Sequence, residues 1–271
     1  ADTALSMGEK EVMTLQLLVA AVNREPRGLA EEMRIDSDAV IVSQGERYGY
    51  EELRWKEHDI RCFYMAERGV GLSRNHSLLR ADADISLFAD EDIIYEPGYE
   101  QKVLAAFEEH PQADLLFFNV RAMPGRETYH NENFGRVRWY NSGRYPTYSL
   151  AVRTRRIHQK NITFSLLFGG GAKYSNGEDS LFIRDCLKAG LKAYKVPVAI
   201  GHERERESTW FTGYNEKFFY DRGVLYHYLY GHLARLMALR FLMSHRGVMC
   251  REIPWRKAYE IMGQGIAKAE E

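Results

Sequence analysis

The sequence predicts an α/β protein in which a mostly parallel sheet is flanked by helices and followed by a helical C-terminal extension. Short apolar runs alternate with segments of helical spacing, as expected for strands that are buried on both faces and joined by helices. From about residue 214 onward the spacing is helical alone. The 271 residues, 45% of them hydrophobic, can bury a sizeable core. We expect a main domain at 11–213 and an extension at 214–271 packed on it.

Six apolar runs are expected to form strands. The first, Leu15–Val22, has the sequence LQLLVAAV, an almost continuous apolar run that is typical of a strand covered on both sides. Residues 23–26 end this strand with a polar break. The remaining strands are expected at 39–43, 60–66, 85–89, 114–120 and 191–200.

Helices are expected where apolar residues recur at helical spacing between these strands. The helix at 71–80 is predicted to take Ser73 as its N-cap, and Gly190 is predicted to end the helix at 178–189. The other helices are expected at 28–33 and from 97–98 to 110. Two segments are expected to lack regular structure: the polar loop 44–50 and the insertion 121–148.

Composition excludes several classes of protein. A net charge of −1 argues against bulk nucleic-acid binding, which needs a strong basic excess. Three widely spaced cysteines indicate free thiols in a reducing compartment. The first ten residues lack a cationic and then apolar pattern, and no uncharged run approaches the ~20 residues that span a bilayer. We therefore expect a cytoplasmic protein, either soluble or peripheral on the cytoplasmic face of the membrane.

Three consecutive acids, Asp90, Glu91 and Asp92, follow the predicted strand 85–89 in the stretch SLFADEDIIY. In a parallel sheet the carboxyl ends of the strands meet at one edge, where ligands bind. Carboxylate oxygens are the ligands that Mg²⁺ and Mn²⁺ prefer. The acids therefore indicate either a divalent-cation site or a solvated acidic turn.

Two further segments carry candidate chemistry. Glu178 and Asp179 begin a predicted helix in the stretch GEDS, directly after a glycine-rich loop, so they can cap the helix or present a general base. The stretch ERGVGLSRN lacks the third glycine of a dinucleotide loop. Its Arg74 can pair with a phosphate of a bound nucleotide or with a surface acid.

Together the strand LLVAAVN, the segment GLSRN, the strand end FADED and the stretch GGGAKYSNGEDSLF resemble the inverting family 2 glycosyltransferases of the GT-A fold, from about residue 15 to residue 214. The nearest likeness is to bacterial enzymes that build cell-surface polysaccharides. The resemblance implies that Asp90, Glu91 and Asp92 form an Asp-x-Asp motif that holds Mn²⁺ or Mg²⁺ on the donor diphosphate. It also implies that Glu178 and Asp179 form the Glu-Asp pair whose second member is the catalytic base.

The resemblance extends to binding residues. The family contacts the nucleotide at the positions of Ala21, Asn23, Gln44, Gly71 and Arg74, together with Asp90 and Glu91. The family often has a hydroxyl residue where Ala20 and Ala21 stand, so backbone groups are expected to substitute. His202 is either a third metal ligand or a structural histidine. The acceptor is expected at Gly171 and at Trp210, a residue that can stack on a sugar or belong to the core.

These residues predict transfer of a sugar from a nucleoside diphosphate sugar, expected to be UDP-linked, to a hydroxyl of a glycan or lipid-linked glycan. Asp179 would accept the proton of the attacking hydroxyl. One alternative is a sugar-1-phosphate nucleotidyltransferase, which needs a glycine-rich phosphate loop where this chain has AAVNREPRG. The other is a non-catalytic subunit that binds a nucleotide sugar.

The C-terminal extension is strongly basic. Residues 222–257 contain seven Lys or Arg and one acid, Glu252, interleaved with leucine and aromatic residues. Such helices can pack on the core, form a homodimer contact or lie on an anionic membrane surface. The apolar positions at roughly helical spacing are Leu225, Leu229, Leu233, Leu236 and Phe241.

Overall fold

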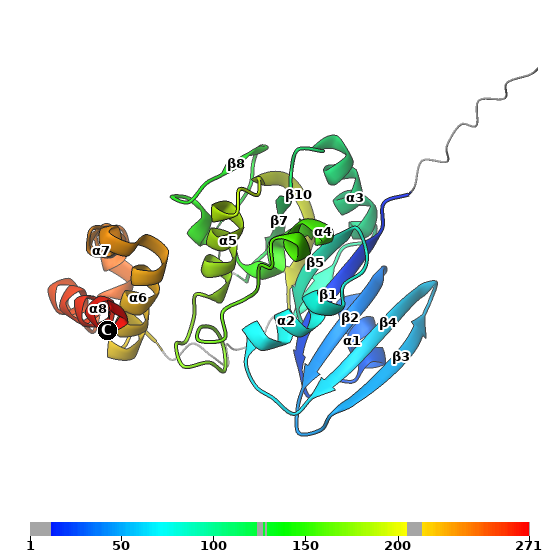
Figure 1. Cartoon of the computed structure of the whole chain (residues 1–271), viewed down its shortest axis with the longest axis horizontal. Helices are drawn as coiled ribbons and strands as arrows, with labels where there is room; N and C mark the ends of the chain where they lie inside the picture. Colours follow the sequence, from blue (N-terminus) through cyan, green and yellow to red (C-terminus); the bar gives the residue numbers. More distant parts are fainter. Residues whose placement is uncertain (1–11, 124–126, 128, 205–212, 271) are drawn as a thin grey trace, which may run out of the picture.

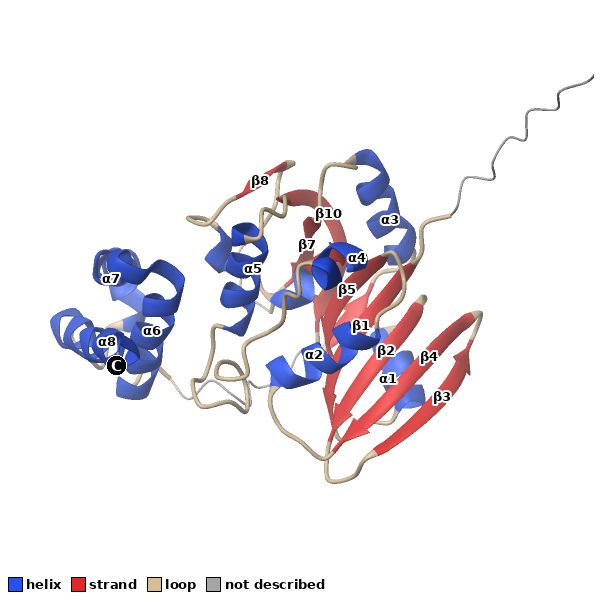
Figure 2. Cartoon of the chain, in the orientation of Figure 1, coloured by secondary structure: helices blue, strands red, loops and turns tan. Residues whose placement is uncertain are grey.

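The computed structural model describes residues 12–123, 127, 129–204 and 213–270 (Figure 1). One ten-stranded sheet runs through the main body in the order β3-β4-β2-β1-β5-β9-β7-β10-β6, with β8 paired to β10. Figure 2 shows this sheet with helices on both sides and a separate group of helices at the C-terminal end. The strands are β1 Leu15–Val22, β2 Asp38–Gln44, β3 Gly49–Trp55, β4 His58–Met65, β5 Ile85–Asp90, β6 Ile93–Tyr95, β7 Leu115–Arg121, β8 Gly135–Val137, β9 Leu150–Arg153 and β10 Ala193–Glu203.

Eight α-helices accompany these strands in the described part of the chain. They are α1 Pro26–Met33, α2 Val70–Arg80, α3 Tyr99–Glu109, α4 Thr154–Gln159, α5 Glu178–Lys188, α6 Glu216–Tyr230, α7 Ala234–Met249 and α8 Trp255–Glu270. The predicted α/β class, with its helical C-terminal region, is confirmed. All six predicted strands and the four predicted helices of the main body are present, with ends shifted by a few residues.

Four strands were not predicted, namely β3, β6, β8 and β9, and β8 lies within the segment 121–148 that was expected to be irregular. All four pair antiparallel with their neighbours, so the sheet is more mixed than expected. Strand β3 overlaps the predicted loop 44–50 and pairs antiparallel with β4 at the sheet edge. Its residues are mostly exposed, so it lacks the apolar run by which a buried strand is predicted from sequence. Strand β9 lies antiparallel between β5 and β7 in the middle of the sheet. The central strands β1, β2, β4 and β5 are parallel, as predicted.

Ser73 is not the N-cap of α2, because the helix begins earlier and its cap position is Gly69. The buried hydroxyl of Ser73 instead donates to the carbonyl oxygen of Val42 at 3.3 Å. Gly71, also inside α2, has no space for a side chain, since an added Cβ would lie 2.4 Å from the carbonyl oxygen of Ser165. The first turn of α2 is thus packed tightly against the sheet and the segment before α5.

Alternate residues of each central strand face two separate core layers. Leu17 and Val19 of β1 belong to the layer covered by α1 and α3, whereas Leu18 belongs to the layer covered by α2, α4 and α5. The second layer is rich in aromatic contacts, including Phe164 stacked on Phe182 with ring centroids 4.0 Å apart. Burial on both faces explains why the β1 sequence is almost continuously apolar.

The helical extension, α6 to α8, forms a third core cluster that includes Phe168 and Leu181 of the main body. Helices α6 and α8 cross at glycines: a Cβ on Gly223 would lie 2.1 Å from the carbonyl oxygen of Met262, and one on Gly265 would lie 2.2 Å from that of Tyr220. Because glycine has no Cβ, the backbones of α6 and α8 can lie in direct contact at these positions. Among the described helices, none is both long and apolar enough to cross a membrane.

Candidate functional site

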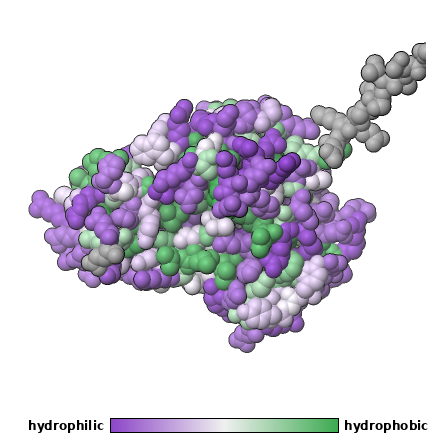
Figure 3. Space-filling model, in the orientation of Figure 1, coloured by the Kyte–Doolittle hydropathy of each residue, from purple (hydrophilic) through white to green (hydrophobic). Residues whose placement is uncertain are grey.

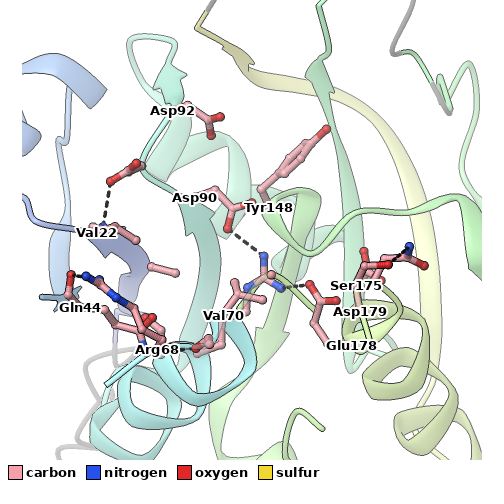
Figure 4. Close-up of a pocket in the computed structure, with 18 of the residues that line it drawn as sticks. Val22, Gln44, Arg68, Val70, Asp90, Asp92, Tyr148, Ser175, Glu178 and Asp179 are labelled. Carbon is pink, nitrogen blue, oxygen red and sulfur yellow. Dashed lines mark hydrogen bonds and ion pairs between the residues drawn. The ribbon is translucent and has the colours of Figure 1, made fainter. Parts of the chain in front are cut away.

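A cavity of about 600 Å³ opens at the carboxyl ends of the parallel strands β1, β2 and β5, as predicted for this sheet topology. Figure 4 shows its residues coming from both sides of the sheet edge and from the loop before α5. The cavity is lined by Ala20, Ala21, Val22, Gln44, Arg68, Gly69, Val70, Ser73, Arg74, Asp90, Glu91, Asp92, Tyr148, Gly170, Ser175, Asn176, Gly177, Glu178, Asp179 and Glu203.

The acidic turn at the end of β5 is fixed by neighbouring strands. The Glu91 carboxylate accepts a hydrogen bond from the backbone N–H of Val22 at 3.0 Å, which ties the turn to the end of β1. The carbonyl oxygen of Asp92 accepts from the backbone N–H of Arg204 at 2.7 Å. These contacts hold Asp90 and Asp92 at the wall of the cavity.

Arg74 joins the two acidic segments that the sequence places far apart. Its Nη2 lies 2.8 Å from Oδ1 of Asp90, and its Nη1 lies 2.9 Å from Oε1 of Glu178 (dashed lines in Figure 4). The Arg74 side chain is only 5% exposed. Burial alone would lower its pKa, but the carboxylates of Asp90 and Glu178 raise the pKa of Arg74 above its usual value.

Arg74 was predicted to pair with a donor phosphate or a surface acid, and in the structure its partners are the carboxylates of Asp90 and Glu178. The guanidinium is buried and both terminal nitrogens are already held by carboxylates, so its role here is to bridge two walls of the cavity. The Glu178 carboxylate has a second contact: its Oε2 accepts a hydrogen bond from the N–H of Gly177 at 3.2 Å.

The Asp179 carboxyl, which lines the cavity beside Glu178, has a raised pKa. Removal from solvent, together with the adjacent charge of Glu178, raises the pKa of Asp179 to about 7, although Arg74 opposes the shift. Its Oδ1 accepts from the backbone N–H of Ser180 at 2.8 Å. The two adjacent acids therefore differ in environment: Glu178 is held in an ion pair with Arg74, whereas the pKa of Asp179 is raised.

The loop that precedes Glu178 and Asp179 is supported by the helical extension. Asp221 of α6 is 2% exposed, and its carboxylate accepts from both the N–H and the hydroxyl of Ser175 at 2.9 Å. Gly177 has φ +117°, and an added Cβ would lie 2.5 Å from Leu225 of α6. Helix α6 therefore packs directly against the start of α5 and fixes the loop that precedes Glu178 and Asp179.

The residues predicted to contact the nucleotide are only partly brought together. Ala21 and Gln44 line the cavity, and the Gln44 side-chain amide donates to the carbonyl oxygen of Gly69 at 3.1 Å. Asn23 is not among the lining residues. It has φ +53°, and its N–H donates to the Gln44 carbonyl oxygen at 2.9 Å, so it shapes the turn after β1. Gly71 does not line the cavity either, because it serves the close packing of α2.

The predicted acceptor residues are not assembled by the described residues. Gly171 does not line the cavity, although its neighbour Gly170 does. At φ +81°, Gly171 makes a close approach to Gly69, with an added Cβ 3.1 Å from the Gly69 backbone nitrogen. Trp210 lies outside the described residues.

The acids at the end of β5 fit a divalent cation shared with a substrate diphosphate. Among the described residues, no three His, Cys, Asp or Glu side chains are grouped to hold a metal by themselves. Mg²⁺ in nucleotide sites is commonly bound by one or two carboxylates plus substrate phosphates. Asp90 and Asp92 supply such oxygens at one cavity wall. His202 lies on β10 opposite Ile94 and does not line the cavity, so its predicted role as a ligand gains no support.

Tyr148 and Glu203 are among the lining residues that were not predicted from the sequence. Burial raises the pKa of Tyr148, and its hydrogen bond to Glu203 raises it further. Tyr148 falls at the end of the segment read as an irregular insertion, so only its three-dimensional position reveals it. Glu203 follows His202, and the alternation of side chains along a strand was the available signal that the two residues face opposite sides.

A family model described as Glycosyl transferase family 2 matches residues 35–174. The crystal structure of S. aureus TarS 1–349 in complex with UDP-GlcNAc is similar, with a TM-score of 0.63 and 15% identity over 94% of this chain and 82% of that chain. The TarS 1–349 complex with UDP gives a TM-score of 0.58 and 15% identity over 89% and 74%. A search of curated protein sequences gave no significant match.

The structural likeness, at this level of identity, shows a shared GT-A fold. The family match is independent of it, covers just over half of the chain, and includes Arg74 and the acidic turn at Asp90–Asp92. It ends just before Glu178 and Asp179, which the cavity places beside that turn. The resemblance predicted from the sequence motifs is confirmed at the level of the family and the fold: the chain belongs to glycosyl transferase family 2.

Proposed function

We propose that this chain is a metal-dependent, inverting glycosyltransferase that transfers a sugar from a nucleoside diphosphate sugar to a hydroxyl group of a glycan or lipid-linked glycan in cell-surface polysaccharide synthesis. The observation that carries the proposal is the single cavity in which Asp179, with its pKa near 7, shares space with Asp90 and Asp92. A base and a site for a diphosphate cation are the two chemical requirements of such a transfer.

Asp179 acts as the general base. It accepts the proton of the acceptor hydroxyl as the oxygen attacks the anomeric carbon and the bond to the diphosphate breaks. Attack from the face opposite the leaving group inverts the anomeric centre in one step. Glu178 does not compete for this role, because its carboxylate is paired with Arg74 and is 11% exposed.

Asp92 and Asp90 would hold Mn²⁺ or Mg²⁺ at the opposite wall. When bound, the cation supplies the Lewis acid that neutralises the charge of the departing diphosphate. Arg74 holds Asp90 in place at 2.8 Å and also fixes Glu178. Arg74 thereby keeps Asp90 and the start of α5 at a constant separation. A displacement reaction needs this, because the reacting groups must be held in a fixed geometry.

The donor is expected to be UDP-linked, as predicted from the sequence. The fold is shared with TarS, whose crystal structures contain UDP-GlcNAc and UDP. Gln44 and the backbone at Ala20–Val22, which line the cavity beside the acids, are the residues available to a base and ribose. Ala20 and Ala21 offer backbone groups only, consistent with the predicted loss of a hydroxyl contact.

Release of the leaving group tests the reaction type. Incubation with a panel of nucleotide sugars, Mn²⁺ and glycan acceptors should release a nucleoside diphosphate in step with glycan product. Release of pyrophosphate from a nucleoside triphosphate and a sugar 1-phosphate would instead identify a nucleotidyltransferase. Donor binding without turnover by any acceptor would identify a binding subunit.

The pH dependence of transfer should report the Asp179 carboxyl. Because a base must be deprotonated to act, kcat/KM should rise with pH and level off above about 7. Below that pH it should fall about tenfold per unit, since each unit reduces the ionised fraction tenfold. A pH-rate profile of kcat/KM checks this. A kcat/KM that stays constant between about pH 5 and about pH 8 would contradict this expectation.

Metal dependence should follow from the acidic turn. We expect excess chelator to remove transfer activity, Mn²⁺ or Mg²⁺ to restore it, and Asp92→Ala to weaken metal-dependent donor binding. Asp84→Ala is a suitable control, because Asp84 lies just before β5 and does not line the cavity. Its carboxylate accepts hydrogen bonds from the N–H and the hydroxyl of Thr14. Calorimetric titration of donor with and without metal measures the effect. Full activity in excess chelator would contradict the metal role and would mean that the acids form only a structural turn.

The helical extension is proposed to dock on the cytoplasmic face of a membrane. Leu225 of the predicted apolar stripe is buried, whereas Leu236 is 63% exposed. Helix α7 has three arginines and no acid, and Met243 and Val248 are also exposed along it. Figure 3 shows hydrophobic atoms among hydrophilic ones over this end of the molecule. Arginines beside exposed apolar side chains are typical of helices that lie on anionic bilayers.

Flotation with liposomes tests this docking. The chain should float with anionic vesicles at low salt, less at high salt, and little with neutral vesicles. Leu236→Glu combined with Val248→Glu should abolish flotation. Leu79→Glu, at a 76% exposed residue of α2, is the matched control and should leave flotation unchanged. No flotation with anionic vesicles at low salt would restrict α7 to a structural or dimer contact.

A further inference from the structure

A second cavity, of about 510 Å³, lies at the other end of α5 from Asp179. It is bounded by the turn after β8, the C-terminal half of α5 and the junction of α6 with the 3-10 turn Gly231–Leu233. In Figure 1, α5 lies between β8 and the helical extension. We call this cavity the cationic groove, because of the residues that line it. Nothing in the proposed transfer reaction uses it.

The groove carries an excess of positive charge. Its described lining residues include Arg136, Arg138, Arg184 and Lys188, and none of them is Asp or Glu. Within the described part of the chain, Arg138 and Lys188 have no carboxylate partner. The Arg184 guanidinium is held in place, since its Nε donates to the Leu229 carbonyl oxygen and its Nη1 to Asp185, both at 3.1 Å. Uncompensated cations around a concavity attract an anionic ligand.

Exposed aromatic rings lie beside these cations. Trp139 is 56% exposed and Tyr140 is 52% exposed, and the two rings meet edge to face at 5.6 Å. Their turn is fixed by a reciprocal pair of hydrogen bonds: the Arg138 N–H donates to Oδ1 of Asn141 at 2.7 Å, and the Asn141 N–H donates to the Arg138 carbonyl oxygen at 3.1 Å. Large aromatic side chains kept exposed on a rigid turn indicate a contact surface.

Helix α5 connects the groove to the catalytic cavity. Asp179 stands in its first turn and Lys188 in its last, and at the rise of an α-helix these positions are about 14 Å apart along the axis. An extended ligand that presents a hydroxyl to Asp179 can therefore reach the groove with a portion a few sugar units away. Flat aromatic surfaces suit the C–H faces of sugar rings, and the cations suit acidic groups on them.

We propose that the cationic groove binds an anionic segment of the acceptor glycan, away from the hydroxyl that receives the sugar. The proposal rests on the proposed function, which supplies the glycan acceptor. Arg138 and Lys188 pair with carboxylate or phosphate groups of the glycan, Arg184 adds a fixed cation, and Trp139 and Tyr140 stack on its rings. The groove thereby selects charged acceptors and orients them along α5.

Binding without donor tests the groove. Hyaluronan oligosaccharides and dextran sulfate are the anionic probes, and chitin oligosaccharides and dextran are their neutral counterparts. The wild-type chain should bind the anionic probes at least about tenfold more tightly, and Arg138→Gln combined with Lys188→Gln should remove that preference. Trp139→Ala should weaken binding of the oligosaccharides as well. Calorimetry gives the affinities, and a native melting profile of each variant confirms its fold.

The matched control exchanges the same residue types elsewhere on the surface. Arg155 and Lys160 are exposed in and beside α4, so Arg155→Gln combined with Lys160→Gln should leave binding unchanged. Equal loss in this control, or equal affinity for neutral and anionic probes, would overturn the proposal. So would phosphatidylglycerol vesicles binding through Arg138 and Lys188 in place of the glycans, because the groove would then be a lipid contact.

The failure of this inference and that of the proposed function are distinguishable. Because the groove residues do not line the donor cavity, the groove variants should keep donor binding. If the chain transfers sugar normally and the Arg138 and Lys188 substitutions have no effect on glycan binding, the groove proposal fails and the proposed function stands. If the groove binds anionic glycan but the chain transfers no sugar, the proposed function fails and the groove proposal stands.

Discussion

Replacing Asp179 by asparagine should abolish sugar transfer while leaving donor binding intact. Asparagine has nearly the same shape but cannot accept a proton, and a general base contributes about 10²–10⁴-fold to a rate. The carboxyl is positioned for this role by the start of α5, and removal from solvent raises its pKa to about 7. Initial rates of glycan formation and calorimetric donor titration measure the two quantities separately.

The control for this variant is Asp59→Asn, at a 72% exposed residue whose carboxylate pairs with Arg54 at the sheet edge. It should retain full activity. Transfer by Asp179→Asn within a few-fold of wild type would remove Asp179 from the role of base. Loss of both transfer and donor binding would place Asp179 in the donor site instead.

Replacing Arg74 by methionine should destabilise the fold by about 3 kcal/mol or more, because it strands two carboxylates in a poorly solvated site. The partners are Asp90 at 2.8 Å and Glu178 at 2.9 Å, whose side chains are 29% and 11% exposed. The same change should loosen the start of α5 and reduce transfer. Urea unfolding followed by circular dichroism measures the free energy of unfolding.

Arg54→Met is the matched control for Arg74→Met. Arg54 and Asp59 also form an ion pair, at 2.7 Å, but their side chains are 57% and 72% exposed. Surface pairs of this kind contribute at most about 1 kcal/mol. A loss of stability in Arg74→Met no larger than that in Arg54→Met would mean that the buried bridge does not hold the two walls together.

Local sequence patterns predicted the parts of the site that belong to single elements. Asp90–Asp92 could be placed at a ligand-binding edge because an apolar strand precedes them and parallel strands end together. Glu178 and Asp179 could be placed at a helix start because a glycine loop and a helical pattern flank them. In both cases the chemistry lies within a few residues of the structural signal.

Long-range contacts could not be predicted in this way. Arg74 meets acids 16 and 104 residues away, and nothing near Arg74 in the chain indicates either partner. Asp221 similarly supports Ser175 across 46 residues, and nothing near Asp221 in the chain indicates that partner. Strand β9 was missed for a related reason: its four residues are stable only because β5 and β7 flank them.

The anomeric configuration of the first transfer product tests the central mechanism most directly. With one base, Asp179, and with Glu178 held by Arg74, the cavity supports a single displacement. Proton NMR of product formed from a donor of known configuration, recorded before mutarotation or further extension, should show only the inverted linkage. A product with retained configuration would contradict the mechanism, because retention requires a second displacement and a nucleophile that this arrangement does not provide.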